Sequence, residues 1–154
     1  FMSDSSPIAW QVFDAGFTAD ALNIRYDRVG ADPQLWLVYE DGGTIYRRSS
    51  EDHGESWSVP TTIATGANPT HDPIESGLRY VYWRDGTALK GQIFDTEWNT
   101  VVSAFTATGV TLDSDSTVEA KVHGGGAGQL VIVVTYKYGG NVKYAYSRNG
   151  QAFS

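Results

Sequence analysis

Arginine side chains and flat aromatic rings are the groups in this sequence whose chemistry best suits a ligand. A guanidinium group binds carboxylates in a fixed geometry, and an aromatic ring stacks on the apolar face of a sugar. Arg25 falls in the β-rich run 21–27. On such a strand an arginine side chain can face an inner channel between sheets. Aromatic residues make up 13% of the chain, more than a small core needs, so some are candidates for ligand contact. These candidates are Trp36, Tyr46, Trp83, Trp98 and Tyr138. Together with Arg25 they predict carbohydrate binding, and packing between sheets is the alternative for each ring.

The other ionisable groups do not form a catalytic or metal-binding pattern. The three histidines, His53, His71 and His123, lack the spacing of metal ligands. Asp113 and Asp115 could supply oxygen ligands to calcium, but no further carboxylates follow at a defined spacing, so a polar loop is the better interpretation. We therefore expect no catalytic residue, no metal site and no cofactor, and we expect that the protein is not an enzyme.

The composition limits the class of protein. A chain of 154 residues suits a single domain, and its abundant glycine, tyrosine and tryptophan favour short strands and tight turns. The formal net charge of −7 argues against nucleic acid and anionic membrane surfaces as partners. No stretch approaches the roughly 20 apolar residues of a membrane-spanning helix, so we expect no membrane insertion. The sequence has no cysteine, which is compatible with a location outside cells.

A short β-rich run occurs three times, which indicates an internal repeat. The runs are 34–39, 77–82 and 129–134, and a glycine-containing turn typical of a β-hairpin follows each of them. Further strands are expected at 44–48, 88–94 and 141–146, at 59–66 and 101–109, and at 21–27 and 116–122. Units of four strands that recur about every 43 to 52 residues are typical of β-propeller blades. A meandering sandwich is the alternative.

The repeat predicts one all-β domain over 1–154 that contains three propeller blades of four antiparallel strands. The blades are expected at 17–66, 67–109 and 110–154, the last without its outer strand, and a closing outer strand is expected at 7–16. Propellers typically have four to eight blades, so three are too few to close a ring. We therefore expect a homo-oligomer, with a dimer favoured, in which two chains form a six-bladed ring and the strand at 7–16 completes the last blade of the neighbouring chain. A trimeric assembly and a piece of a longer propeller are the alternatives.

The segment 50–57 fits the pattern Ser-x-Asp-x-Gly-x-x-Trp between a third and a fourth strand. After Ser50, the Asp52 carboxylate can accept hydrogen bonds from amides of its own turn, and Gly54 supplies a permissive backbone. Trp57 is then expected to cover the hairpin. A degenerate copy in the third unit consists of Ser147, Asn149, Gly150 and Phe153. The second unit keeps an acidic residue and a tryptophan within 94–98.

These segments resemble the Asp-box (BNR) repeat family of β-propellers, which includes sialidases and lectin-like, glycan-binding proteins. The architecture covers most of the chain, whereas the motif match is confined to the boxes. The resemblance implies that the boxes have a folding role and lie away from the binding face. Sialidases also need three arginines that converge on a carboxylate, a Tyr–Glu nucleophile pair and an acid/base residue, and the sequence offers no convincing set of these.

We therefore expect a non-catalytic propeller module for recognition outside cells or on a virion surface, with carbohydrate binding or adhesion as its activity. The expected partners are a glycan and further copies of the chain. A phage virion or tail protein is compatible with the resemblance. The alternatives are a fragment of a sialidase-type glycoside hydrolase and a purely structural virion decoration protein without a ligand.

Overall fold

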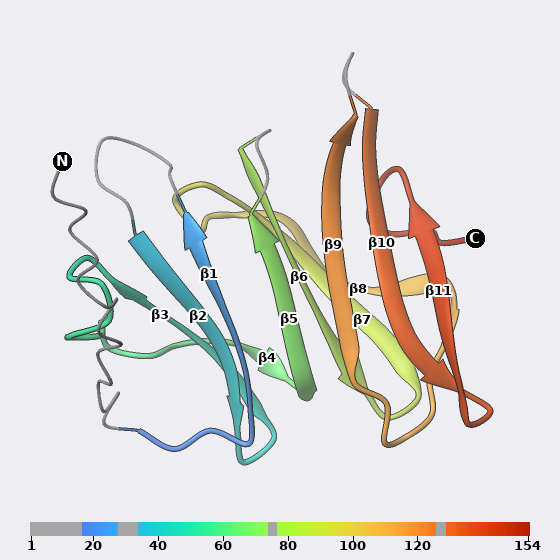
Figure 1. The fold of residues 1–154 in the computed structure, drawn as a ribbon, viewed down its shortest axis with the longest axis horizontal. Helices are drawn as coiled ribbons and strands as arrows, with labels where there is room; N and C mark the ends of the chain where they lie inside the picture. Colours follow the sequence, from blue (N-terminus) through green and yellow to red (C-terminus); the bar gives the residue numbers. More distant parts are fainter. Residues whose placement is uncertain (1–16, 28–33, 74–76, 126–128) are drawn as a thin grey trace, which may run out of the picture.

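The computed structural model describes residues 17–27, 34–73, 77–125 and 129–154, and within them it contains eleven strands in three antiparallel sheets (Figure 1). Sheet 1 consists of β1 (Ala21–Asp27), β2 (Gln34–Asp41), β3 (Thr44–Ser50) and β4 (Thr61–Thr65). Sheet 2 consists of β5 (Ala67–Pro73), β6 (Leu78–Asp85), β7 (Ala88–Asp95) and β8 (Thr100–Thr111). Sheet 3 consists of β9 (Val118–Gly125), β10 (Gln129–Tyr138) and β11 (Asn141–Ser147). The described residues contain no helix that could span a membrane.

The predicted all-β class and every strand predicted within the described residues are confirmed, with ends that differ by a few residues. The sequence did not single out β5, whose composition is unusual for a strand because it contains Pro69 and Pro73. The closing strand expected at 7–16 lies outside the described residues. The three sheets do not close into a ring or barrel within the described part of the chain.

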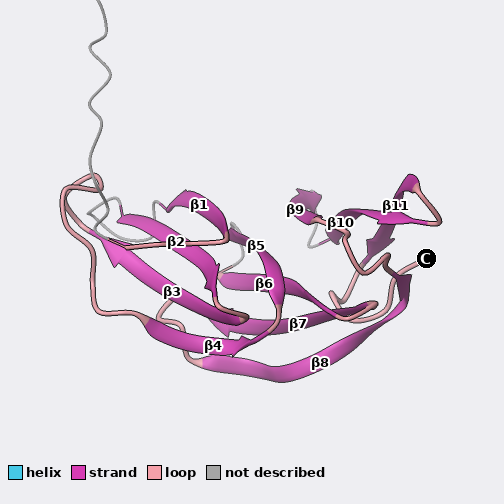
Figure 2. Ribbon diagram, turned by 90° about the horizontal axis from the view of Figure 1, so that it is seen from below, coloured by secondary structure: helices cyan, strands magenta, loops and turns pink. Residues whose placement is uncertain are grey.

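The sheets are stacked, with sheet 2 between the other two (Figure 2). A core centred on Val38, Ile45 and Trp83 joins sheet 1 to sheet 2. A larger core that includes Tyr82 and Ile132 joins sheet 2 to sheet 3. The first strand of each sheet lies at the same edge of the stack, so β1, β5 and β9 run side by side (Figure 1).

The β-hairpins define which positions of the three sheets are equivalent. Each hairpin turns over two residues, and the residues that flank the turns are paired, as in Asp41 with Thr44 and Tyr138 with Asn141. By this register Val38 is equivalent to Tyr82 and to Thr135. The sequence match with 34–39 therefore places 77–82 one residue and 129–134 two residues out of phase. Since neighbouring residues of a strand point to opposite faces, the one-residue error exchanges the two faces of sheet 2 relative to sheet 1.

The Asp-box hairpin has the expected hydrogen bonds. The Ser50 hydroxyl donates to Asp52 Oδ1 at 2.7 Å and accepts the Gly54 amide at 2.8 Å, while Asp52 Oδ1 accepts the Ser56 amide at 2.8 Å. The Ser56 hydroxyl also donates to Asp52 Oδ2. This hydrogen bond first, and then those of the Ser56 amide and the Ser50 hydroxyl, hold the pKa of Asp52 far below its usual range. Gly54 has a φ of 98°, a conformation that glycine adopts readily.

The degenerate copy in sheet 3 has the same arrangement with an amide in place of the carboxylate. The Ser147 hydroxyl donates to Asn149 Oδ1 at 3.0 Å and accepts the Gly150 amide at 2.9 Å. Asn149 Oδ1 also accepts the amides of Gln151 and Ala152, each at 3.0 Å. The box at the end of β3 and the box at the end of β11 are therefore the same structural device.

The buried serine of each box is expected to contribute to stability. In Ser50→Ala and Ser147→Ala, a buried amide, of Gly54 or Gly150, loses its acceptor, which should lower the free energy of unfolding by about 2 kcal/mol in each variant. Urea denaturation measures this loss. Ser103→Ala, at an exposed position of β8, is the control and should stay within about 0.5 kcal/mol of wild type. Equal stability of all three variants would contradict the structural role of the boxes.

Sheet 3 has three strands within the described residues, and the chain after its box begins to pair with it. The Tyr146 and Ser154 amides each donate to the other residue's carbonyl oxygen, at 3.1 and 3.0 Å. In sheet 1, the Ser58 amide donates to the Ser49 carbonyl at 2.9 Å, and Ser49 is equivalent to Tyr146. Ser154 thus stands where the chain enters the fourth strand of a sheet.

Candidate functional site

Arginines and tryptophans form a cluster at the interface of sheets 1 and 2. The Trp36 ring of β2 lies 4.9 Å from the Trp98 ring, centroid to centroid. The Arg47 guanidinium lies 4.8 Å from the Trp98 centroid, and that of Arg79 lies 5.1 Å from the Trp36 centroid. These are cation–π distances, so the rings stabilise two cations that lie close together. We call Trp36, Arg47, Arg79 and Trp98 the arginine–tryptophan cluster.

A tight turn between β7 and β8 positions Trp98. Asp95 Oδ1 accepts the Glu97 amide at 2.9 Å and the Asn99 amide at 2.8 Å, and Trp98 itself has a φ of 63°. The Asn99 side-chain amide also donates to Asp95 Oδ2 at 2.9 Å. This hydrogen bond first, and then the two from backbone amides, lower the pKa of Asp95. The eroded box of the second unit therefore still uses an aspartate to hold its turn. This turn directs the Trp98 ring into the interface between the sheets, where Trp98 is 5% exposed.

The electrostatics of the cluster are cationic. Burial lowers the pKa of Arg47, and the neighbouring charge of Arg79 lowers it further. The Arg79 guanidinium donates to the Thr96 carbonyl at 2.9 Å. Trp36 and Arg47 are partly exposed, so this positive region is open to solvent in a protein with a net charge of −7. Such a region favours an anionic group of a ligand.

His71 of β5 lies beside the cluster and is completely buried. Its ring centroid is 6.2 Å from that of Trp98, and neither ring nitrogen has a hydrogen-bond partner among the described residues. Burial, together with the charges of Arg25, Arg79 and Lys121, lowers its pKa to about 3. The imidazole is therefore neutral at physiological pH and fills the interface.

A network of charged groups links the first strands of the three sheets. Arg25 Nε of β1 lies 3.8 Å from Asp72 Oδ1 of β5, and Arg25 Nη2 lies 3.5 Å from Glu119 Oε1 of β9. The Lys121 ammonium lies 3.2 Å from the same Glu119 oxygen, and Asp72 Oδ2 accepts the Val122 amide at 2.7 Å. The charges in this network compensate one another, so it ties the sheets together.

The structure brings some of the predicted site residues together and separates others. Arg25 is paired with Trp36 in the β1–β2 register, next to the cluster. Trp83 is 2% exposed and Trp98 5% exposed, so both rings pack between sheets and are closed to a ligand. Tyr46 stacks on Tyr39, on the face of sheet 1 away from the cluster. Tyr138 is 48% exposed at the β10–β11 turn of sheet 3.

The sequence alone does not predict Arg47 and Arg79 as ligand contacts. Arg47 and Trp36 are both on the face of sheet 1 that packs on sheet 2. Arg79 occupies the corresponding end of β6, across the interface. The available signal is the aromatic residues of β2 together with the basic residues of β3 and β6, and it becomes informative only with the correct face assignment.

The aspartates considered for calcium have structural partners. Asp113 accepts the amides of Gly139 and Gly140 at 2.9 and 3.0 Å, and Asp115 lies 2.6 Å from the Lys137 ammonium. No group of three or more histidine, cysteine or acidic side chains suited to a metal ion occurs within the described ranges. The interpretation of Asp113 and Asp115 as parts of a polar loop agrees with these contacts.

Neither a known family model nor a characterised protein matches this sequence.

Proposed function

We propose that the chain is a non-catalytic recognition module that binds carbohydrate outside cells or on a virion surface. The observation that carries this proposal is the arginine–tryptophan cluster, which combines a partly exposed ring, Trp36, with the partly exposed guanidinium of Arg47. An aromatic face and an adjacent arginine are the groups that suit a sugar ring and its polar substituents. Because the cluster is cationic, the favoured ligand is a glycan that carries a carboxylate or a sulfate.

The contacts of the nearby acidic groups support a binding role over a catalytic one. Asp72 accepts a backbone amide and faces Arg25, and Glu119 is shared by Arg25 and Lys121. The buried Tyr82 hydroxyl donates to the Gly150 carbonyl at 2.7 Å. Burial raises the pKa of Tyr82 well above its usual range, which is unfavourable for a nucleophile.

A glycan array, with binding affinities measured for the glycans that score, tests the proposal. We expect acidic glycans to bind, and we expect Trp36→Ala and Arg47→Ala each to weaken binding about tenfold or more, which corresponds to about 1.4 kcal/mol. Tyr138→Ala, at the distant turn of sheet 3, is the control and should bind as wild type does. Binding that is insensitive to both cluster variants would contradict the site, and a blank array would favour the structural decoration role.

A sialidase-type hydrolase fragment remains the second candidate, because Arg25, Arg47 and Arg79 all lie near Trp36. Turnover of a fluorogenic sialoside would establish this candidate and contradict the non-catalytic proposal. Glycan binding without turnover is the result we expect.

The module is further proposed to act as a homo-oligomer, with two chains in one ring of six sheets. Two copies would present the cluster twice, and paired sites raise the apparent affinity for a surface that displays many glycans. In this assembly the segment 7–16 would complete sheet 3 of the neighbouring chain.

A further inference from the structure

Equivalent positions of the three sheets differ sharply in their exposed fraction. Ile45 of sheet 1 and Leu89 of sheet 2 are each 0% exposed, because the following sheet covers them. Their equivalent in sheet 3 is Val142, the second residue after the hairpin turn in each case, and it is 85% exposed. Sheet 3 thus presents, without a cover, the face that sheets 1 and 2 bury.

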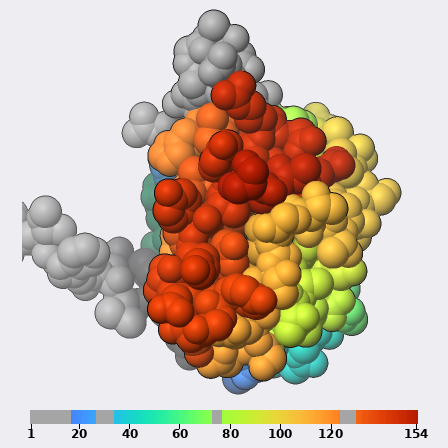
Figure 3. Space-filling view, turned by 90° about the vertical axis from the view of Figure 1, so that its right-hand side faces the viewer, coloured from blue at the N-terminus to red at the C-terminus, as the bar shows by residue number. Residues whose placement is uncertain are grey.

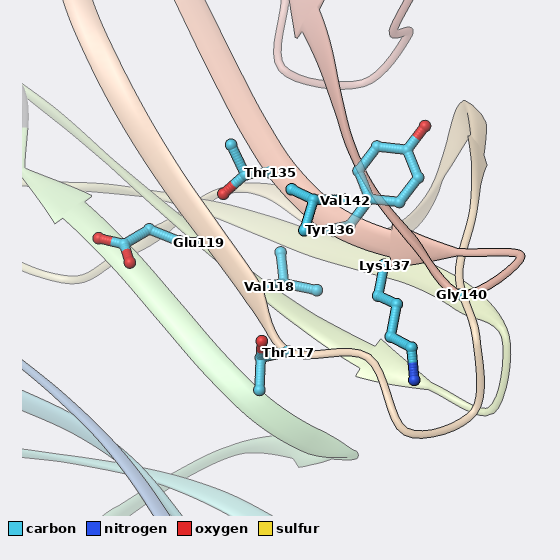
Figure 4. Close-up of a pocket in the computed structure, with 8 residues that line it drawn as sticks. All are labelled: Thr117, Val118, Glu119, Thr135, Tyr136, Lys137, Gly140 and Val142. Carbon is cyan, nitrogen blue, oxygen red and sulfur yellow. The ribbon is translucent and has the colours of Figure 1, made fainter.

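The uncovered face of sheet 3 is apolar along β11. Tyr144 and Tyr146 follow Val142 on the same face and are 75% and 49% exposed. This end of the molecule is viewed in Figure 3, where β10 and β11 lie at the surface. A hollow of about 360 Å³ adjoins Val142, Glu119 and Thr135 (Figure 4). We call the face with Glu119, Thr135, Val142, Tyr144 and Tyr146 the outer face of sheet 3.

At the other end of the stack, β1 of sheet 1 presents an exposed apolar row, beside Leu37 and Tyr39 of β2, which lie on the same face and are 4% and 3% exposed. His71 of β5 and Ala120 of β9 are each 0% exposed, because the preceding sheet covers them. Their equivalent in β1 is Ile24, which is 43% exposed. Leu22 and Tyr26 flank it on the same face with exposures of 63% and 47%. We call the face with Leu22, Ile24 and Tyr26 the outer face of sheet 1.

A hydrogen bond repeats at both interfaces of the stack. The His71 amide of sheet 2 donates to Asn23 Oδ1 of sheet 1 at 3.3 Å. The Ala120 amide of sheet 3 donates to Thr70 Oγ1 of sheet 2, also at 3.3 Å. Asn23 and Thr70 are equivalent positions, and the same position in sheet 3 is Glu119. Glu119 is therefore a hydrogen-bond acceptor at the place where a next sheet would present an amide.

We propose that the outer face of sheet 3 binds the outer face of sheet 1 of a second copy of this chain, and that Glu119 of the first copy accepts the Ile24 amide of the second. The occupant is a second copy because the outer face of sheet 1 presents Ile24 at the position that His71 and Ala120 occupy at the two existing interfaces. Sheet 2 separates the two outer faces within one chain, so the contact forms between chains, head to tail. Two such contacts join two copies into a ring of six sheets.

The apolar side chains on the two faces supply the driving force. Each of the two faces carries a group of exposed aliphatic and tyrosine side chains, and such a group is typical of an interaction surface. The inference rests on the homo-oligomer part of the proposed function and is independent of glycan binding.

Single-face variants test the contact by light scattering. Ile24→Glu places a charge on the outer face of sheet 1, and Val142→Glu places one on the outer face of sheet 3. Each variant alone should have the solution mass of one 16.8 kDa chain, whereas the wild-type protein should have the mass of two. The reason is that every contact between copies of one variant includes a face that carries the added charge. Val59→Glu, at an 84% exposed position between the Asp-box and β4, is the control and should keep the mass of wild type.

An equimolar mixture of Ile24→Glu and Val142→Glu distinguishes a head-to-tail contact from a symmetric one. In the mixture, the outer face of sheet 3 in Ile24→Glu and the outer face of sheet 1 in Val142→Glu are both unchanged, so one contact between the two variants is intact. About half of the material or more should therefore recover the mass of two chains at high protein concentration. Glu119→Ala should weaken self-association about tenfold or more, since a hydrogen bond to a charged acceptor is lost, whereas Glu119→Gln should retain most of it.

Several results would overturn the inference. A wild-type protein with the mass of one chain would do so, and so would face variants that remain dimeric or a mixture that stays monomeric. Loss of association in Ile24→Glu but not in Val142→Glu would indicate a symmetric contact through sheet 1. Circular dichroism on each variant separates a lost contact from a lost fold. A blank glycan array with an intact dimer would contradict the glycan proposal and leave the interface standing.

Discussion

Gly109→Ala is expected to lower the free energy of unfolding by about 3 kcal/mol or more. Gly109 has a φ of 82°, and a Cβ atom at this position would lie 1.9 Å from the Phe153 carbonyl oxygen. The surrounding backbone cannot move away freely, because the Thr108 amide donates to the Gln151 carbonyl and the Phe153 amide donates to the Thr108 carbonyl, each at 2.9 Å. The added methyl group would therefore separate the box of sheet 3 from β8.

Gly86→Ala provides the matched control for this variant. Gly86 also has a positive φ, 59°, but a Cβ atom there would meet nothing within 4 Å. It should lose about 1 kcal/mol, the cost of the left-handed backbone without the clash. The difference between the two variants, measured by urea denaturation, isolates the close approach of Phe153 to β8. Equal losses would show that the two segments are not held together as described.

His71 is expected to make the protein lose stability as the pH falls below neutrality. Its pKa is about 3 in the folded protein and about 6.5 when unperturbed, so between these values the unfolded chain binds a proton that the folded protein does not. The stabilisation by neutral His71 is complete above pH 6.5 and is lost as the pH falls toward 3, by up to about 1.4 kcal/mol per pH unit. We expect a fall of about 2 kcal/mol between pH 6.5 and 4.5.

Two variants assign this pH dependence to His71. The measurement is the free energy of unfolding at several pH values between 6.5 and 4.5, a window above the range in which Asp52 and Asp95 begin to lose their own contributions. His71→Leu should flatten the profile, because the titrating group is removed. His123→Gln, at an exposed position, should leave the slope unchanged. A slope that persists in His71→Leu would contradict a buried neutral imidazole.

Much of the strand order could be predicted from the sequence, because β-rich runs and two-residue glycine turns are local signals. The turn at Gly42 and the serine-led boxes at Ser50 and Ser147 depend on residues close together in the chain. The strand β5 was not singled out because its prolines and polar residues are unfavourable for β-structure. It is an edge strand of sheet 2, a position in which proline is tolerated, and it packs against β1 and β9 of the neighbouring sheets.

The faces of the sheets and the candidate site were harder to predict because they depend on packing between distant segments. A match of hydrophobic runs equates Tyr39 with Tyr82, yet the hairpins equate Tyr39 with Trp83. This single-residue difference decides which side chains point to a neighbouring sheet. No property of an isolated run contains that information.

The same face assignment connects the fold to the proposed function. Sheet 2 is covered on both faces, whereas β1 of sheet 1 and β11 of sheet 3 each present exposed apolar side chains, which the proposed contact between copies would cover. A contact between copies would repeat the interfaces already present and would place two arginine–tryptophan clusters in one particle.

An experimental structure of the particle that the unmodified chain forms in solution tests this central claim most directly. We predict six sheets around one axis from two chains, with a Glu119 carboxylate oxygen of each chain within about 3.5 Å of the Ile24 amide nitrogen of the other. A single three-sheet stack, or two stacks joined through the same face of each, would contradict the account.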